Sequence, residues 1–326
     1  MGKVIQLEHR HRHQTWGATE MARRVVGVVE QAKLLVFPPP KAAPVERGDI
    51  ILGAWTGSPL LRNPAKECAF ATHLGLSRLD PMVNTFSMAR RATKFKLRKS
   101  ARSTKRWDKV FDEAFAHGIE IHLVAWPNPN PSYINSMAAE IMPLLNDYPF
   151  ASICHDTEEP WTTAEGFSHA EAGMRISDAF ADRPCPMGAT GIGYVGRRGN
   201  FSQLARHCDY LMSQGYSLHS DVAPEKFGKR YLDLFSIITH PGLAAYRQKK
   251  TKSSRVGARM AVHYESLLRY YQSPEWRAAA DDAIRGPWPE LARPAAVYWS
   301  LGWLHNNRTA RQFLINLQAQ PLAVAA

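Results

Sequence analysis

Cysteine is scarce in this chain, with four residues in 326, and none of them forms a CxxC pair or the Cys/His spacing of a zinc site. Scattered so widely, the thiols are expected to be reduced and buried. Apolar runs of about 20 residues are also missing, so we expect no membrane span. The N-terminus has no evident secretory signal.

Acidic residues are outnumbered: 41 Lys and Arg stand against 29 Asp and Glu, a formal net charge of +12. This balance indicates either a contribution to solubility or a polyanionic neighbour, such as nucleic acid, anionic lipid or a bacterial cell wall that carries acidic polymers. The densest charge is at residues 90–106, where nine Lys or Arg are interleaved with Phe95 and Leu97. That segment is a solvated helical face, a docking surface for an acidic polymer or a nucleic-acid site. No recognised nucleic-acid module accompanies it, so nucleic acid is not an expected partner.

Strand-like apolar runs alternate with helical patterns over most of the chain, which predicts an α/β fold, a (β/α)8 TIM barrel. An open doubly wound sheet is the competing architecture. Several runs are apolar on both faces, as buried parallel strands must be. The predicted strands are 49–55, 74–79, 119–126, 150–156, 187–192, 210–216, 256–263 and 295–303. The predicted helices are 104–117, 131–147, 163–182, 201–207, 274–285 and 308–318.

Residues 1–47 are expected to form an extension: a basic arm, a helix at 18–36 and a Pro-rich linker at 37–44. Residues 48–326 are expected to form the barrel domain.

Active sites of such barrels lie at the carboxyl ends of the strands. Polar and aromatic residues at the predicted strand ends suit a carbohydrate-binding cleft, in which aromatic rings stack on sugar faces. The candidate substrate-binding residues are Trp55, Asp80, Trp126, Asn128, Glu159, Tyr194, Gln214, Tyr216 and Trp299.

Three carboxylates stand within four residues at the end of the predicted fourth strand, at Asp156, Glu158 and Glu159. Positions i and i+2 of a strand point to the same side, so Asp156 and Glu158 share a face. Coupling between two such carboxylates pushes their pKa values apart, which allows one to remain protonated as a general acid. We predict Glu158 as the general acid and Asp156 as its stabilising partner. Surface charge or a helix N-cap is the alternative interpretation.

The Asp156-Thr-Glu158 ending resembles the Asp-x-Glu signature of family 25 glycoside hydrolases, the lysozyme-like muramidases. With Pro160 it is also similar to the Asp-x-Glu-x-Pro ending of the family 18 chitinase motif. Residues 208–216 resemble the Asp-Tyr-x-Met-x-Gln-x-Tyr strand of uncharacterised hydrolase-like barrels of bacteria and phages. This resemblance implies a glycoside hydrolase barrel over roughly residues 48–305, with Glu158 as the acid.

The chain departs from those families at three places. The muramidases have an Asp at the end of the first strand, where this chain has Trp55, and another after the eighth, where it has Trp303-Leu-His-Asn306. The chitinases have an Asp two residues before Asp-x-Glu, where this chain has Cys154. The second catalytic carboxylate therefore stays open.

Two other patterns in the sequence could in principle bind a nucleotide or a metal ion. Residues 191–196 spell GxGxxG, but no apolar helix follows directly, as a dinucleotide site requires. A metal site would need His155 and His263 to converge on Asp156. We expect neither, and no cofactor.

The sequence thus predicts a hydrolase, a glycosidase acting on peptidoglycan or a related amino-sugar polymer, that adheres to acidic wall polymers through its basic surface. A phage endolysin that stays cytoplasmic until released, or a virion-associated enzyme, would fit the lack of a secretory signal. The alternative is a non-catalytic barrel that serves as a virion structural or carbohydrate-binding protein.

Overall fold

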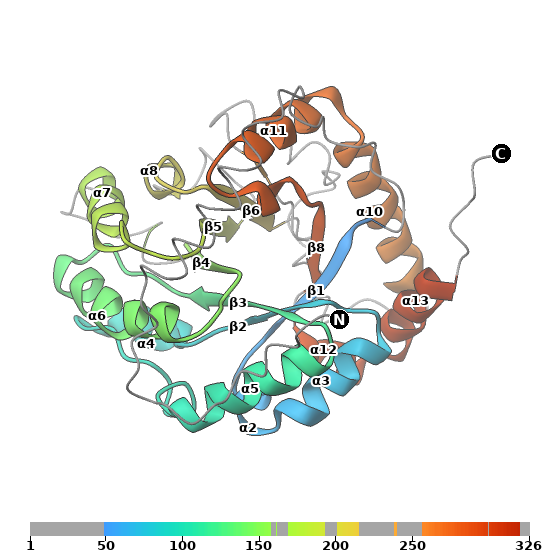
Figure 1. Ribbon diagram of the computed structural model, residues 1–326, viewed down its shortest axis with the longest axis horizontal. Coiled ribbons are helices and arrows are strands. Elements are labelled where there is room, and N and C mark those ends of the chain that lie inside the picture. The colour runs from blue at the N-terminus through green and yellow to red at the C-terminus, as the bar shows by residue number, and fades with distance from the viewer. Residues whose placement is uncertain are drawn as a thin grey trace, which may run out of the picture. The chain divides into compact units, whose positions relative to one another are not determined.

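Eight parallel strands form one sheet in the order β7-β6-β5-β4-β3-β2-β1-β8 (Figure 1). The computed structural model describes residues 49–157, 161, 169–192, 201–214, 238–239, 256–298 and 300–319. The strands are β1 (Ile51–Thr56), β2 (Arg78–Pro81), β3 (Glu120–Ala125), β4 (Ser152–Asp156), β5 (Met187–Ile192), β6 (Tyr210–Gln214), β7 (Ile238–Thr239) and β8 (Ala295–Tyr298). Sequential parallel neighbours, with the last strand beside the first, are the arrangement of a (β/α)8 barrel, so the predicted fold is confirmed.

Helices connect the strands and lie around the outside of the sheet (Figure 1). They are α2 (Ser58–Arg62), α3 (Pro64–His73), α4 (Phe86–Arg91), α5 (Thr104–Ala116), α6 (Pro131–Asp147), α7 (His169–Ala179), α8 (Phe201–Ala205), α10 (Val256–Tyr271), α11 (Pro274–Arg285), the 3-10 helix η2 (Pro289–Ala292), α12 (Leu301–Asn306) and α13 (Arg308–Ala319). None of these described helices is long and apolar enough to cross a membrane.

Local sequence explains where the best-defined helices begin and end. The side chain of Asn130 accepts hydrogen bonds from the backbone N–H groups of Ser132 and Tyr133 and caps α6, and a proline follows it at the first helical position. Ser273 caps α11 in the same way, through the N–H of Trp276. After α5 the chain reverses at Gly118, whose φ of 63° is readily adopted only by glycine. The predicted bounds of α6 and α11 are confirmed.

The register of the strands separates the side chains that point into the barrel from those that face the helices. Gly53 on β1 is opposite Arg78 on β2, and a Cβ on Gly53 would lie 2.8 Å from Arg78 Cγ. Arg78 lines the same cavity as Tyr210 of β6, four strands away, so this side of the sheet is the interior. Alternation then directs Asp80 inward as well. On β4, Ser152, Cys154 and Asp156 point inward, because Ser152 contacts Tyr210.

Three strand predictions are wrong in whole or in part. Residues 256–263, expected as the seventh strand, form the first half of α10, and the strand beside β6 is Ile238–Thr239. The second strand, expected at 74–79, begins only at Arg78, because α3 continues to His73 and a turn at Gly75 follows. The eighth strand, expected at 295–303, ends at Tyr298, and residues 301–303 belong to α12.

The described residues all belong to one compact unit, Lys41–Ala326. The predicted arm, helix and Pro-rich linker at residues 1–47 lie outside the described residues, and that division of the chain stays a prediction.

Replacing Gly188 with Ala should destabilise the barrel by about 1–3 kcal/mol, because overpacking in a full core forces side chains from their preferred positions. A Cβ at this position would lie 2.2–2.5 Å from three ring atoms of Tyr210, whose hydroxyl is held by Ser152. Urea unfolding measures the change. Gly302→Ala is the control, since the nearest atom there is 3.9 Å away and alanine suits α12. Equal stability of the two variants would mean that Tyr210 moves aside freely.

Candidate functional site

Asp156 is the last residue of β4 and lies at the end of the barrel where active sites of this fold are found. Its position is fully buried, and it is opposite Thr190 of β5 in the register. It shares the interior side with Cys154, two residues earlier. An aspartate at this depth has no contact with bulk solvent.

The two residues that bracket the predicted general acid are both anchored. Thr157 is buried, and its N–H and hydroxyl both donate to the carbonyl of Thr190, each at 2.7 Å. Trp161 is also fully buried and donates from its ring nitrogen to the carbonyl of Pro127 at 3.1 Å. Glu158 and Glu159 lie between these anchors in the sequence but outside the described residues.

Asp80, a predicted substrate-binding residue, is committed to an ion pair inside the barrel. Arg78 Nε and Nη2 donate to the two carboxylate oxygens of Asp80 at 2.8 and 2.7 Å, and both side chains are almost completely buried. Burial by itself would lower the pKa of Arg78, but the adjacent carboxylate of Asp80 more than offsets it, and the pKa lies above its ordinary value. A paired, bidentate carboxylate is poorly suited to act as nucleophile or base.

Trp126 and Asn128, two further predicted contacts, follow β3 and hold the loop after β2 in place. Trp126 N donates to Asn84 Oδ1 at 2.8 Å, and Asn84 Nδ2 donates to the Trp126 carbonyl at 2.9 Å. The Trp126 ring packs edge-on against Phe86 of α4 at 5.8 Å and is 9% exposed. Asn128 Nδ2 donates to the carbonyl of Ala89 at 2.7 Å.

Sequence reasoning missed Asn84, although it is fully buried and joins two loops at the carboxyl end of the barrel. The sequence signal was a polar residue five positions after a predicted strand, which is common in loops.

The remaining predicted residues are distributed as follows. Trp55 is the second-last residue of β1 and is fully buried in the core, and Gln214 is the last residue of β6. Tyr194, Tyr216 and Trp299 lie outside the described residues. All of these roles stay predictions.

The positions of His155 and His263 do not suit a metal site with Asp156. His155 points to the helix side of β4, where its ring packs edge-on against Phe180 at 5.3 Å, and burial lowers its pKa to about 3. His263 is on helix α10, not at a strand end. Among the described residues, no group of three or more metal-ligating side chains comes together.

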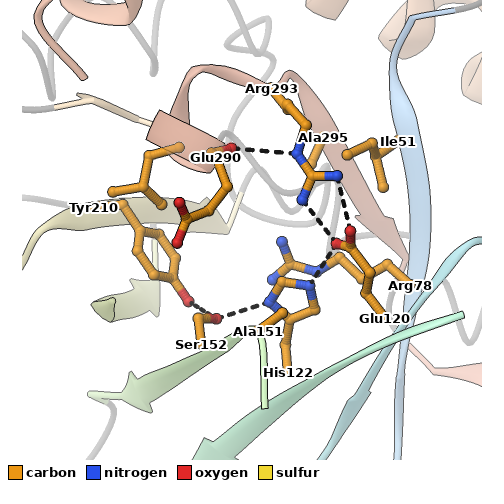
Figure 2. Close-up of a pocket in the computed structure, with 11 residues that line it drawn as sticks. Ile51, Arg78, Glu120, His122, Ala151, Ser152, Tyr210, Glu290, Arg293 and Ala295 are labelled. Atoms are coloured by element: carbon orange, nitrogen blue, oxygen red, sulfur yellow. Dashed lines mark hydrogen bonds and ion pairs between the residues drawn. The ribbon is translucent and has the colours of Figure 1, made fainter. Parts of the chain in front are cut away.

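A small cavity lies at the opposite end of the barrel, near the start of the strands (Figure 2). Ser152 Oγ lies 2.8 Å from both His122 Nδ1 and the hydroxyl of Tyr210. Arg293 Nη1 and Nη2 donate to the carboxylate oxygens of Glu120 at 2.8 and 3.0 Å, and this joins the start of β3 to the segment before β8. His122 Nε2, at 3.4 Å, and Arg293 together lower the pKa of Glu120 to about 2. The cavity volume of about 30 Å³ has room for one or two water molecules, not for a sugar.

Side chains thus line a small cavity at the start of the strands, and the carboxyl end of β4 carries Asp156. This polarity is the usual one for enzymes of this fold.

The fold is similar to that of solved glycoside hydrolases. A GH18 chitinase from Pseudoalteromonas aurantia matches with a TM-score of 0.53 and 11% identity, over 83% of this chain and 99% of that chain. A family 1 β-glucosidase from Thermotoga maritima matches with a TM-score of 0.51 and 11% identity, over 80% and 90%. The sequence matches no protein-family model and no curated protein. At this identity the likeness defines the class by fold alone: a (β/α)8 barrel like those of glycoside hydrolases.

Proposed function

We propose that this protein is a glycosidase that cleaves peptidoglycan or a related amino-sugar polymer. The observation that carries the proposal is the interior position of Asp156 at the carboxyl end of β4, directly before Thr157-Glu158. Two proteins of similar fold are a chitinase and a β-glucosidase, which supports the reaction class.

In this proposal Glu158 protonates the glycosidic oxygen, and Asp156 stabilises the positive charge that develops in the transition state. Glu158 directly follows the anchored residue Thr157 in the sequence, which supports its assignment as the acid.

The carboxylates at the strand ends support the proposed substrate class. At the described strand ends these are Asp156 and Asp80, and Asp80 is held by Arg78 through both of its oxygens. A sugar that bears a 2-acetamido group can supply the nucleophile itself, as in substrate-assisted glycosidases, so that one acid and one stabilising carboxylate suffice. Peptidoglycan and chitin both carry this group.

The alternative is a non-catalytic barrel that serves as a virion structural or carbohydrate-binding protein. Two other observations favour it: Arg78 binds both carboxylate oxygens of Asp80, and β1 ends in Trp55 and Thr56 instead of a carboxylate. Under either proposal the protein reaches the wall by release from the cytoplasm or as part of a virion.

Incubation of the full chain with purified peptidoglycan, chitin and cellulose tests the proposal. We expect soluble fragments from one or both of the acetamido-bearing polymers and none from cellulose, with the new reducing ends identified by mass spectrometry. Release from cellulose would refute the substrate class. Binding to peptidoglycan without any fragments would favour the non-catalytic barrel.

A further inference from the structure

The densest positive charge of the chain lies at the same end of the barrel as Asp156. Residues 90–106 complete the connection from the carboxyl end of β2 to the first turn of α5, and connections that leave the carboxyl ends of strands form the mouth of such a barrel. The segment contains no Asp or Glu. We call its nine basic residues the cationic rim: Arg90, Arg91, Lys94, Lys96, Arg98, Lys99, Arg102, Lys105 and Arg106.

The backbone of the cationic rim is firmly held, although most of its charged side chains are exposed. Phe95 is buried against Tyr133 of α6, with ring centroids 5.6 Å apart, and its N–H donates to Ser136 Oγ at 2.7 Å. The N–H of Leu97, also buried, donates to the carboxylate of Glu140 at 2.9 Å. Alternation along this extended stretch leaves Lys94 and Lys96 exposed on the opposite side. The charged side chains therefore extend from a backbone whose position is fixed by these contacts.

Arg98 brings the cationic rim to the ends of two strands. Its Nε donates to the carbonyl of Asn84 at 2.8 Å, and its N–H donates to the carbonyl of Val83 at 2.7 Å, both directly beyond β2. A Cβ on Gly57, just after β1, would lie 3.2 Å from Arg98 Nη1. One end of the positive surface thus borders the barrel mouth.

Five of the nine charges have no ion-pair partner in the described part of the chain: Lys94, Lys96, Lys99, Arg102 and Lys105. The first turn of α5 has no acidic residue and instead carries basic ones, beside the positive end of the helix dipole. The nearby Glu140 is used by a backbone N–H. An external anion would relieve this repulsion.

The rings in this region argue against single-stranded nucleic acid as that anion. Proteins that hold single strands without sequence preference stack the bases on exposed aromatic side chains. Phe95 and the adjacent Trp107 are 1% and 0% exposed, so neither offers a stacking surface. The cationic rim therefore offers a ligand its charged side chains, which suit a flexible polymer that is recognised by its phosphates.

We propose that the cationic rim binds a cell-wall polymer with a phosphodiester backbone, and that this contact holds the wall against the barrel mouth. The choice of a wall polymer rests on the proposed function. The phosphates would be bound one by one by lysine and arginine side chains, with release of counterions and hence a strong dependence on salt.

Binding of the full-length protein to purified poly(glycerol phosphate) teichoic acid, measured at 50 and 200 mM salt by fluorescence anisotropy, tests this proposal. The variant Lys94→Gln/Lys96→Gln should bind about tenfold more weakly at the lower salt, and its salt slope should fall by about 2, one for each lost phosphate contact. The matched control, Lys66→Gln/Arg206→Gln, removes the same charge from exposed positions elsewhere and should bind within about twofold of the wild type.

Equal losses in the two variants would overturn the proposal, because net charge alone would then explain binding. A double-stranded DNA of similar charge that bound more tightly, and depended on Lys94 and Lys96, would also overturn it in favour of nucleic acid. No bond is cleaved in this assay, so its outcome is separate from that of the proposed function. If the protein cleaves peptidoglycan but its binding to teichoic acid does not depend on Lys94 and Lys96, only the proposed role of the cationic rim is refuted. If binding depends on these residues but nothing is cleaved, only the proposed glycosidase activity is refuted.

Discussion

Replacing Glu158 with Gln should reduce the rate of peptidoglycan cleavage by roughly 10²–10⁴-fold, the usual contribution of a positioned general acid. Glutamine has nearly the same size and shape but cannot donate an acidic proton to the leaving oxygen. Binding should persist, because the substrate is held by other residues. Clearing of peptidoglycan in a gel measures cleavage, and sedimentation with insoluble peptidoglycan measures binding.

Glu159→Gln is the matched control, since it removes the same charge one residue further along the chain. It should retain cleavage within about tenfold, because the predicted role of Glu159 is substrate contact and not proton transfer. Asp156→Asn should also lower the rate, because an uncharged amide stabilises a developing cation less well. If Glu158→Gln cleaves as fast as the wild type, Glu158 is not the acid and the proposed mechanism fails.

Periodicity in the sequence predicted the barrel well where strands were long and apolar, as in β1, β3 and β4. The strand prediction failed at residues 256–263 because this stretch is too short to distinguish the period of a strand from that of a helix. The buried positions Val256, Met260, Tyr264 and Leu267 recur every three or four residues, the period of a helix, and this is visible only when the pattern is followed to Tyr271. The observed β7 has only two described residues, too few for any periodic signal.

The candidate site was predictable in one respect. The sequence predicts Asp156 at the carboxyl end of the fourth strand, and it is the last residue of β4. The hydrogen bonds of Asn84 depend on loops that meet only in the folded chain, 42 residues apart in sequence, so no local pattern reveals them. The Arg78–Asp80 pair was equally hidden, because a strand with charges on its buried side contradicts the pattern by which buried strands are recognised.

Arg78→Met alone or Asp80→Leu alone should destabilise the protein by about 3–5 kcal/mol, because each leaves one charge buried without its partner. The two side chains are only 6% and 0% exposed. The double variant should be more stable than either single one, since apolar residues replace both charges and no unpaired ion remains. Urea unfolding of the four proteins gives the coupling energy of the pair.

The exposed pair Arg175–Glu171 on α7 is the control for this cycle. Its atoms are 2.9 Å apart, but the side chains are 44% and 45% exposed, so Arg175→Met should cost less than about 1 kcal/mol. Additive effects of Arg78→Met and Asp80→Leu would show that the buried pair is not energetically coupled.

The same double variant separates the two roles that Asp80 could have. Loss of activity in Asp80→Leu alone is ambiguous, because an unfolded barrel cleaves nothing. In the double variant the fold is restored while the carboxylate is still missing. Cleavage at the wild-type rate would make Asp80 a structural partner of Arg78, held below the mouth. Loss of cleavage from a fully folded double variant would instead place the Asp80 carboxylate in the substrate site, as the sequence predicts.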